Sequence, residues 1–247
     1  MLAIEPAPAR DFLKALPDLL PDRPAAILVV SAHWERTSPA LGAPERPSVI
    51  HDFHGFPAEL YRLDYPAPTS ASLARRAADL LAGAGLAADI DASRGRDHGV
   101  WIPLMLAWPD AQLPVVQLSV QTNLGARHHF RLGRALSPLR AEGVLILGSG
   151  SFTHDLSSFR LSEGRLDATE QNWVHAFAEW MKAALCEGRT DDLLEYRRRA
   201  PFAARNHPTE EHLLPLYVAL GAGSDTIRQL HQSTTYGILR MDAYAFG

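Results

Sequence analysis

Histidine is the residue type with the clearest chemical potential in this chain, which contains 11 of them. Four short phrases carry the histidines of interest, at residues 31–34, 97–99, 150–156 and 207–212. Three of these phrases follow a strand-like run or a Gly/Pro break, where an open α/β sheet delivers side chains into a common crevice. Because neutral imidazole binds zinc, iron, copper and nickel, we predict that the phrases build one metal site.

Three histidines stand where regular structure would fix their position. His33 lies just past an apolar, strand-like run, where a side chain leaves the core. His154 follows a second such run through a Gly-Ser-Gly-Ser turn, which lets the backbone come close to a ligand. His212 is predicted to lie in the first turn of a helix over 209–220 that Thr209 caps. We predict that His33, His154 and His212 are metal ligands.

A fourth histidine, His98, stands between Asp97 and Gly99. A neighbouring carboxylate tunes the basicity of an imidazole, and a glycine leaves room for substrate, so we predict that His98 transfers a proton. Glu211 offers a carboxylate beside His212, and two roles stay open for it: metal ligation, or interaction with the start of the predicted helix. Simple hydrogen-bonding roles are predicted for the histidines at 128, 129, 175 and 231.

Length and composition indicate one globular domain over residues 1–247. A chain of 247 residues with 47% hydrophobic and 21% charged content can bury one sizeable core. A net charge of -4 and the lack of a basic stripe with interleaved aromatic residues argue against a nucleic-acid partner. The apolar runs are too short to cross a bilayer and no apolar leader follows Met1, so we predict a cytoplasmic protein without membrane contact.

Short apolar runs alternate with longer helical patterns along the chain. Parallel strands need helical crossovers, so this order predicts an α/β fold with a mostly parallel central sheet and helices on both faces. Strands are expected at 25–32, 115–120, 144–149 and 238–246. Helices are expected at 8–20, 70–82, 99–108, 126–142 with an interruption at Pro138, 169–185 and 209–220. Within a long loop at 38–68, the aromatic segment 51–65 is expected either to cover an aromatic ligand or to pack as a surface loop.

At these phrases the chain resembles the class III extradiol ring-cleavage dioxygenases, and within them the DOPA-dioxygenase-like group. The similarity runs in one order through residues 1–12, 29–34, 51–61, 97–104, 148–156, 207–222 and 237–247. It implies an α/β/α fold, a non-haem Fe(II) or Zn(II) site, and oxygen-dependent opening of a catechol ring next to its two hydroxyls, without a separate organic cofactor. It also implies that His33 and His212 are metal ligands, that His154 is a ligand or an acid/base residue near the metal, and that His98 is a proton carrier on the substrate side.

The chain departs from the family at its start. Members usually begin with a strand followed by Ser-His-Gly-Ser-Pro, whose histidine is a further metal ligand, and Met1 stands just after the place of that segment. Without the strand, the sheet would expose apolar surface and leave backbone groups unpaired. Because the other phrases persist, we expect that the true start lies upstream; the alternative is a form that binds metal poorly.

The predicted function is therefore a metal-dependent extradiol dioxygenase that opens a catechol-type aromatic ring with molecular oxygen. Two other classes stay open. A zinc-dependent hydrolase would use the same histidines to activate water and would turn over without oxygen, although the compact His-Glu-x-x-His motif is missing. A non-catalytic metal-binding protein is the third alternative if the chain truly starts at Met1.

Overall fold

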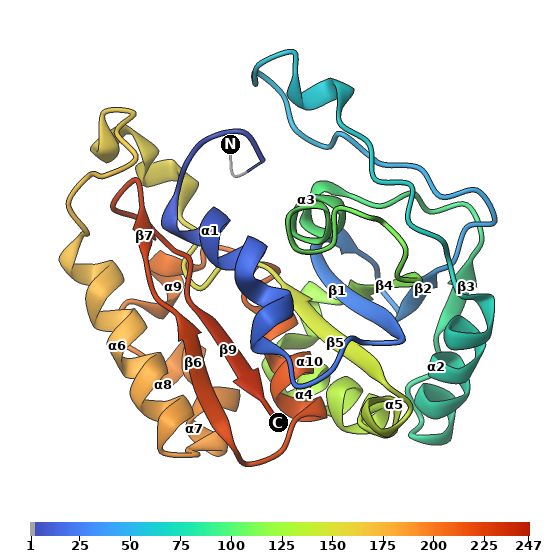
Figure 1. The fold of residues 1–247 in the computed structure, drawn as a ribbon. Coiled ribbons are helices and arrows are strands. Elements are labelled where there is room, and N and C mark those ends of the chain that lie inside the picture. Colours follow the sequence, from blue (N-terminus) through green and yellow to red (C-terminus); the bar gives the residue numbers. More distant parts are fainter. Residues whose placement is uncertain (1–2) are drawn as a thin grey trace.

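The computed structural model describes residues 3–247, whose centre is a five-stranded sheet with the order β3-β2-β4-β1-β5 (Figure 1). Strand β1 (Ala26–Glu35) pairs in parallel with β4 (Val115–Val120) and with β5 (Val144–Ser149). Strand β2 (Ala40–Gly42) is parallel to β3 (Asp89–Asp91) and antiparallel to β4. The mostly parallel sheet expected from the sequence is confirmed.

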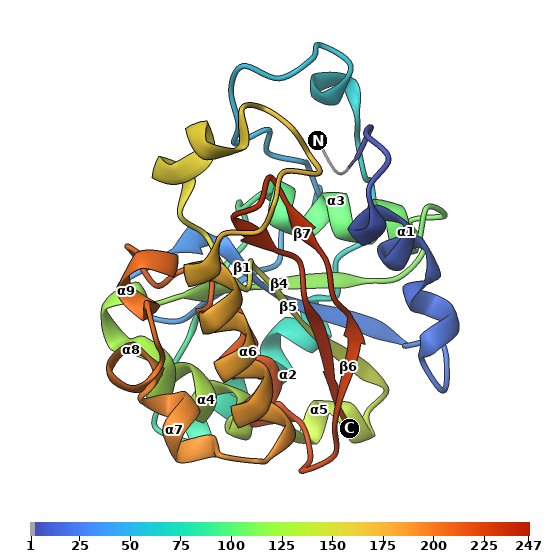
Figure 2. The same cartoon turned by 90° about the vertical axis from the view of Figure 1, so that its left-hand side faces the viewer.

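Helices cover both faces of this sheet. On one face lie α1 (Pro8–Ala15) and α3 (His98–Ala107), and on the other lie α2 (Ala71–Gly83) and α4 (Gly125–Leu136) (Figure 2). Behind β5, α10 (Leu214–Ala222) packs on α4, and α6 (Asn172–Cys186) lies further out. The predicted α/β/α arrangement is therefore correct.

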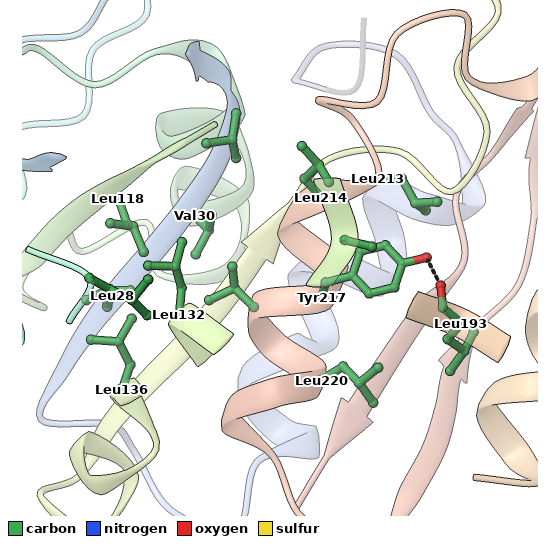
Figure 3. Close-up of a cluster of buried hydrophobic side chains, with 14 of the residues drawn as sticks. Leu28, Val30, Leu118, Leu132, Leu136, Leu193, Leu213, Leu214, Tyr217 and Leu220 are labelled. Carbon is green, nitrogen blue, oxygen red and sulfur yellow. Dashed lines mark hydrogen bonds between the residues drawn. The ribbon is translucent and has the colours of Figure 1, made fainter. Parts of the chain in front are cut away.

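The surroundings of strand β1 explain why its first five residues, 26–30, are all apolar. Leu28 and Val30 point into the core shared with α4 and α10, whereas Ile27 and Val29 point into the core shared with α1 and α3. All four side chains are fully buried, because successive residues of a strand face opposite sides and both sides are covered. In the first core, the buried Tyr217 hydroxyl donates a hydrogen bond of 2.9 Å to the Leu193 carbonyl (Figure 3).

The remaining elements are short. They are the 3-10 helices η1 (Leu16–Leu19), η2 (Leu60–Arg62), η3 (Thr122–Leu124) and η4 (Leu156–Ser162), the helices α5 (Pro138–Ala141), α7 (Thr190–Leu194), α8 (Tyr196–Arg199) and α9 (Ala203–Asn206), and the strands β6 (Ile227–His231), β7 (Thr234–Thr235), β8 (Leu239–Arg240) and β9 (Ala243–Phe246). No helix within residues 3–247 has both the length and the apolar composition required to cross a bilayer.

The helix predicted over 209–220 begins later than expected. Helix α10 starts at Leu214 and carries Pro215 in its first turn. Proline suits this position because backbone N–H groups of the first turn have no acceptor within the helix, so the N–H that proline lacks is not needed. The Thr209 hydroxyl donates to the Glu211 carboxylate, 2.9 Å away, instead of capping the helix. His212 therefore lies in the turn before α10 and not inside it.

The single strand expected at 238–246 is also wrong, because two strands with different partners occupy that stretch. Strand β8 pairs with β7, and β9 pairs with β6. The two strands are separated at residues 241–242, directly after Arg240, whose guanidinium is buried against the carboxylates of Glu170 and Glu179, 3.1 Å from each. These ion pairs hold Arg240 beside α6 while β9 continues along β6.

One edge of the sheet is open. Strand β5 ends the strand order, and within residues 3–247 only β1 pairs with it. A groove of about 1020 Å³ runs along its free edge, between β5, α1 and α10 on one side and residues 243–247 of β9 and the chain end on the other. His212 contributes to the wall of this groove.

Candidate active site

His33 and His98 meet at the end of β1 where it leaves the core. His33 lies near the last residue of β1, His98 is the first residue of α3, and the centres of their rings are 4.0 Å apart. Gly99 permits this approach, because a Cβ at residue 99 would stand 2.6 Å from the Ser31 hydroxyl oxygen and 3.0 Å from the His33 ring. The glycine expected to leave room for substrate thus leaves room for the His33 imidazole.

Asp97 fixes the start of α3 against the sheet. Its fully buried carboxylate accepts hydrogen bonds from the Ser31 hydroxyl at 2.6 Å, from the Arg94 guanidinium at 3.1 Å, and from the Gln117 amide. The sequence suggested that Asp97 tunes the adjacent His98. The carboxylate that contacts His98 is instead Asp52, whose Oδ1 lies 2.9 Å from His98 Nδ1.

His154 and His212 meet at the end of β5. The Ser151 N–H donates to the His212 carbonyl at 2.9 Å, and a Cβ at Gly150 would stand only 2.1 Å from that carbonyl oxygen. The sequence suggested that the glycine turn lets the backbone approach a ligand. In the structure, the turn instead lets the backbone approach the His212 segment. As a result, the rings of His154 and His212 stack with their centres 3.4 Å apart.

The two pairs form one cluster. The ring centres of His33 and His212 are 4.9 Å apart, so histidines from four separate segments of the chain converge. Two carboxylates complete the cluster and create two groups able to hold a metal ion: His33 with Asp52 and His98, and His154 with Glu211 and His212. We call these six residues the histidine cluster. The structure brings together all four histidines selected from the sequence.

Burial keeps two of the predicted ligands, His33 and His154, in their metal-binding form. It lowers the pKa of His33 and of His154 to about 3, with further lowering from the neighbouring histidines, so both rings are neutral near pH 7. Burial alone would raise the pKa of Glu211, but hydrogen bonds from His212 and Thr209 bring it down to about 2. Neutral imidazoles beside an ionised carboxylate are the donor set of a zinc or non-haem iron site, so the residues present fit such a metal.

Asp52 is the site residue that sequence reasoning missed. It lies in the aromatic segment 51–65, which was singled out for its rings and not for a carboxylate. Burial would raise its pKa, but hydrogen bonds from the side chain and backbone of His98 lower it to about 2. Asp52 lies in neither a strand nor a helix, and its role follows from the packing of this loop against His98 of α3.

The other histidines have partners elsewhere. The His129 ring accepts from the Gln121 N–H and contacts the Gly125 carbonyl, whereas His175 pairs with Glu170. The fully buried His207 ring lies 3.1 Å from the Phe152 carbonyl, so it connects the histidine phrases at 150–156 and 207–212.

Comparison with known proteins agrees with this geometry. Residues 7–246 match the family model described as the catalytic LigB subunit of aromatic ring-opening dioxygenase. A protein of Beta vulgaris named 4,5-DOPA dioxygenase extradiol is 42% identical over 253 residues, with 100% of this chain and 92% of that protein covered. The protein of that name from Escherichia coli K12 is also 42% identical, over 203 residues, which cover 81% of this chain and 73% of the relative.

A solved structure extends the similarity to three dimensions. The crystal structure of an uncharacterized protein from Escherichia coli K12 matches with a TM-score of 0.80 and 33% identity, over 99% of this chain and 94% of that one. The matched region contains the whole histidine cluster. The chain therefore belongs to the LigB family of aromatic ring-opening dioxygenases, which are extradiol, oxygen-dependent oxidoreductases.

Proposed function

We propose that this protein opens the ring of a catechol-type substrate with molecular oxygen at the histidine cluster, and that His33, His154 and His212 hold a catalytic Fe(II) or Zn(II) ion. The observation that carries the proposal is the convergence of half-buried imidazoles from four separate segments of the chain in one cluster. The bound metal would act as a Lewis acid toward the two hydroxyls of the catechol.

His98 is suited to take up a hydroxyl proton from the substrate. Its ring lies beside His33, and within residues 3–247 its Nε2 atom has no hydrogen-bond partner. A histidine with one free ring nitrogen next to a metal site has the geometry of a general base. His154, stacked on His212, would serve as a ligand or as a second proton carrier.

The aromatic segment 51–65 offers a surface for the substrate ring. The Phe53 ring lies edge-on to the His98 ring at 5.6 Å and contacts Phe56 and Tyr61, and each of these two is 39% exposed. Aromatic rings pack favourably edge to face, so exposed aromatic side chains beside His98 can hold the ring of a bound substrate. Because several relatives are named 4,5-DOPA dioxygenase extradiol, we include catechols with an amino-acid side chain among the proposed substrates.

The direct test is turnover. Protein loaded with Fe(II) or with Zn(II) under nitrogen is mixed with DOPA and simpler catechols, and both oxygen uptake and the visible absorbance of the ring-opened product are recorded. We expect equimolar consumption of oxygen and substrate, and loss of turnover in His212→Ala. Turnover that proceeds without oxygen would instead favour a hydrolase.

We also propose that an additional strand of the same polypeptide fills the groove beside β5. Within residues 3–247, no strand pairs with the free edge of β5, which faces a groove of about 1020 Å³ with β9 on its other side. A strand in this groove would join the central sheet to β6 and β9 and would end beside His212. The strand expected before Ser-His-Gly-Ser-Pro would have this place. Reading the coding DNA upstream of Met1 tests this, because no such segment in frame would exclude it.

The location and remaining partners stay predictions. We expect a cytoplasmic enzyme whose partners are the aromatic substrate and oxygen, without nucleic acid.

A further inference from the structure

Asp52 makes two contacts with His98 through a single oxygen atom. Its Oδ1 accepts a hydrogen bond from the His98 backbone N–H at 2.9 Å and lies 2.9 Å from Nδ1 of the same residue. Helix α3 receives no cap from Asp97, the residue before it, so the Asp52 carboxylate takes the place of the cap. The side chain of Asp52 is only 25% exposed, although it comes from a loop.

The loop before Asp52 is anchored to the segment that leads into α3. The Ile50 N–H donates to the Arg96 carbonyl at 2.6 Å, and the Arg96 N–H donates to the Ser48 carbonyl at 2.8 Å. On the other side, the Trp101 indole N–H donates to the Ile50 carbonyl at 3.2 Å. Helix α3 and the segment before it therefore both hold the backbone at Ile50, two residues before Asp52. This fixes the position of the Asp52 carboxylate even though it lies in a loop.

These contacts define the protonation pattern of the His98 ring. A carboxylate oxygen only accepts hydrogen bonds, and the backbone N–H keeps this oxygen directed at His98, so the proton of the neutral ring belongs on Nδ1. The other nitrogen, Nε2, is then the one able to take up a proton. We propose that Asp52 is a positioning residue that holds His98 in the tautomer with protonated Nδ1 and turns Nε2 toward the substrate.

The same carboxylate also faces His33. The Oδ2 atom of Asp52 lies 3.5 Å from His33 Nδ1, so the carboxylate stands between the two rings. A carboxylate behind a ligating histidine orients the ring and leaves its Nε2 for the metal. Asp52 would thus align the proposed base and one proposed ligand with a single group.

This inference rests on the proposed function, and it competes with two simpler roles for Asp52. As a metal ligand in the group with His33 and His98, Asp52 would govern metal content. As a purely structural residue, it would govern the stability of the loop and of α3. A positioning residue changes the turnover number and the His98 tautomer while metal content stays the same.

The test compares Asp52→Asn and Asp52→Ala. The asparagine oxygen still accepts from both His98 donors, so we expect Asp52→Asn to keep kcat within about fivefold of the original. Asp52→Ala loses both contacts, and we expect kcat to fall about 10- to 100-fold with KM changed less than about threefold and one metal per chain retained. Asp64→Ala serves as the control, because among the residues that the structure describes only the Tyr65 N–H donates a hydrogen bond to this carboxylate of the same loop.

The second readout does not depend on turnover. In Zn(II)-loaded protein with nitrogen-15 in its histidines, the chemical shifts of the ring nitrogens distinguish protonated from unprotonated atoms, and His98→Gln assigns the signals. We expect protonated Nδ1 in the original protein and in Asp52→Asn, and a mixture of tautomers in Asp52→Ala.

Three results would overturn the proposal: an unchanged His98 tautomer in Asp52→Ala, an unchanged kcat in that variant, or a loss of metal that parallels the loss of kcat. A wild-type protein that opens no catechol ring would refute the proposed function, and the tautomer measurement alone would then decide the role of Asp52.

Discussion

Replacing Gly99 by alanine tests how closely the fold brings His33 and His98 together. The new Cβ would stand 2.6 Å from the Ser31 Oγ, so it must move by about 0.7 Å to reach an ordinary carbon–oxygen contact of roughly 3.3 Å. Ser31 cannot simply turn away, because its hydroxyl donates to the buried Asp97 at 2.6 Å. The displacement therefore passes to α3 and separates His98 from His33.

Two opposing effects set the expected magnitude. Overpacking in a dense site costs about 1–3 kcal/mol, while alanine in a helix is favoured over glycine by up to about 1 kcal/mol, and less in the first turn. Overpacking is the larger effect, so we expect the free energy of unfolding to fall by about 1–2 kcal/mol. Misplacement of a catalytic group by less than 1 Å is expected to lower kcat/KM about 10- to 100-fold.

The assay combines urea unfolding with catechol turnover, and Gly83→Ala is the matched control. Gly83 ends α2, and a Cβ there would meet nothing within 4 Å, so we expect unchanged activity and a stability equal to or slightly above that of the original. If Gly99→Ala behaved like Gly83→Ala in both measurements, the proposed crowding at Ser31 and His33 would be wrong.

Three further predictions concern stability and binding. In metal-free protein, His33 and His154 stay neutral down to a pKa of about 3, whereas the unfolded chain protonates them near pH 6.5, so the free energy of unfolding should fall as pH drops from about 6.5 to 4. Each extra proton on the unfolded chain contributes up to about 1.4 kcal/mol per pH unit, and a flat urea-unfolding profile over this range would contradict the burial argument. Tyr217→Phe leaves the Leu193 carbonyl without its buried donor and should cost about 1–2 kcal/mol in urea unfolding; an unchanged midpoint would refute that role. His212→Ala should lower the measured metal content below one ion per chain, and full occupancy would exclude His212 as a ligand.

The parts of the fold that the sequence predicted well are those with a strong apolar pattern. The boundaries of β4 and β5 were predicted to the residue, because each is a mostly apolar run of six residues between turn signals. Strands β2 and β3 were missed because three residues are too few to establish a period, and their pairing partners, not their composition, make them strands. The start of α10 was misplaced because Thr209 is a good cap residue, while Pro215 decides where the helix begins.

The site was predictable where histidines follow strands and turns, and unpredictable where a side chain acts across the fold. His33 and His154 lie near or after the ends of strands, His98 and His212 lie at or before the starts of helices, and the parallel sheet brings such points together. Asp97 is next to His98 in sequence but turns into the core, whereas Asp52, which is 46 residues away, contacts its ring. Contacts of this kind depend on how a loop packs, which local patterns do not encode.

Anomalous diffraction from crystals of metal-loaded protein tests the central claim most directly. Data at the iron or zinc absorption edge locate the ion without reference to the protein atoms. We predict a single strong peak per chain, about 2.0–2.1 Å from a ring nitrogen of each of His33, His154 and His212. A peak outside the histidine cluster, or one bound by Asp52 and His98 without His154 and His212, would contradict this account of the metal site.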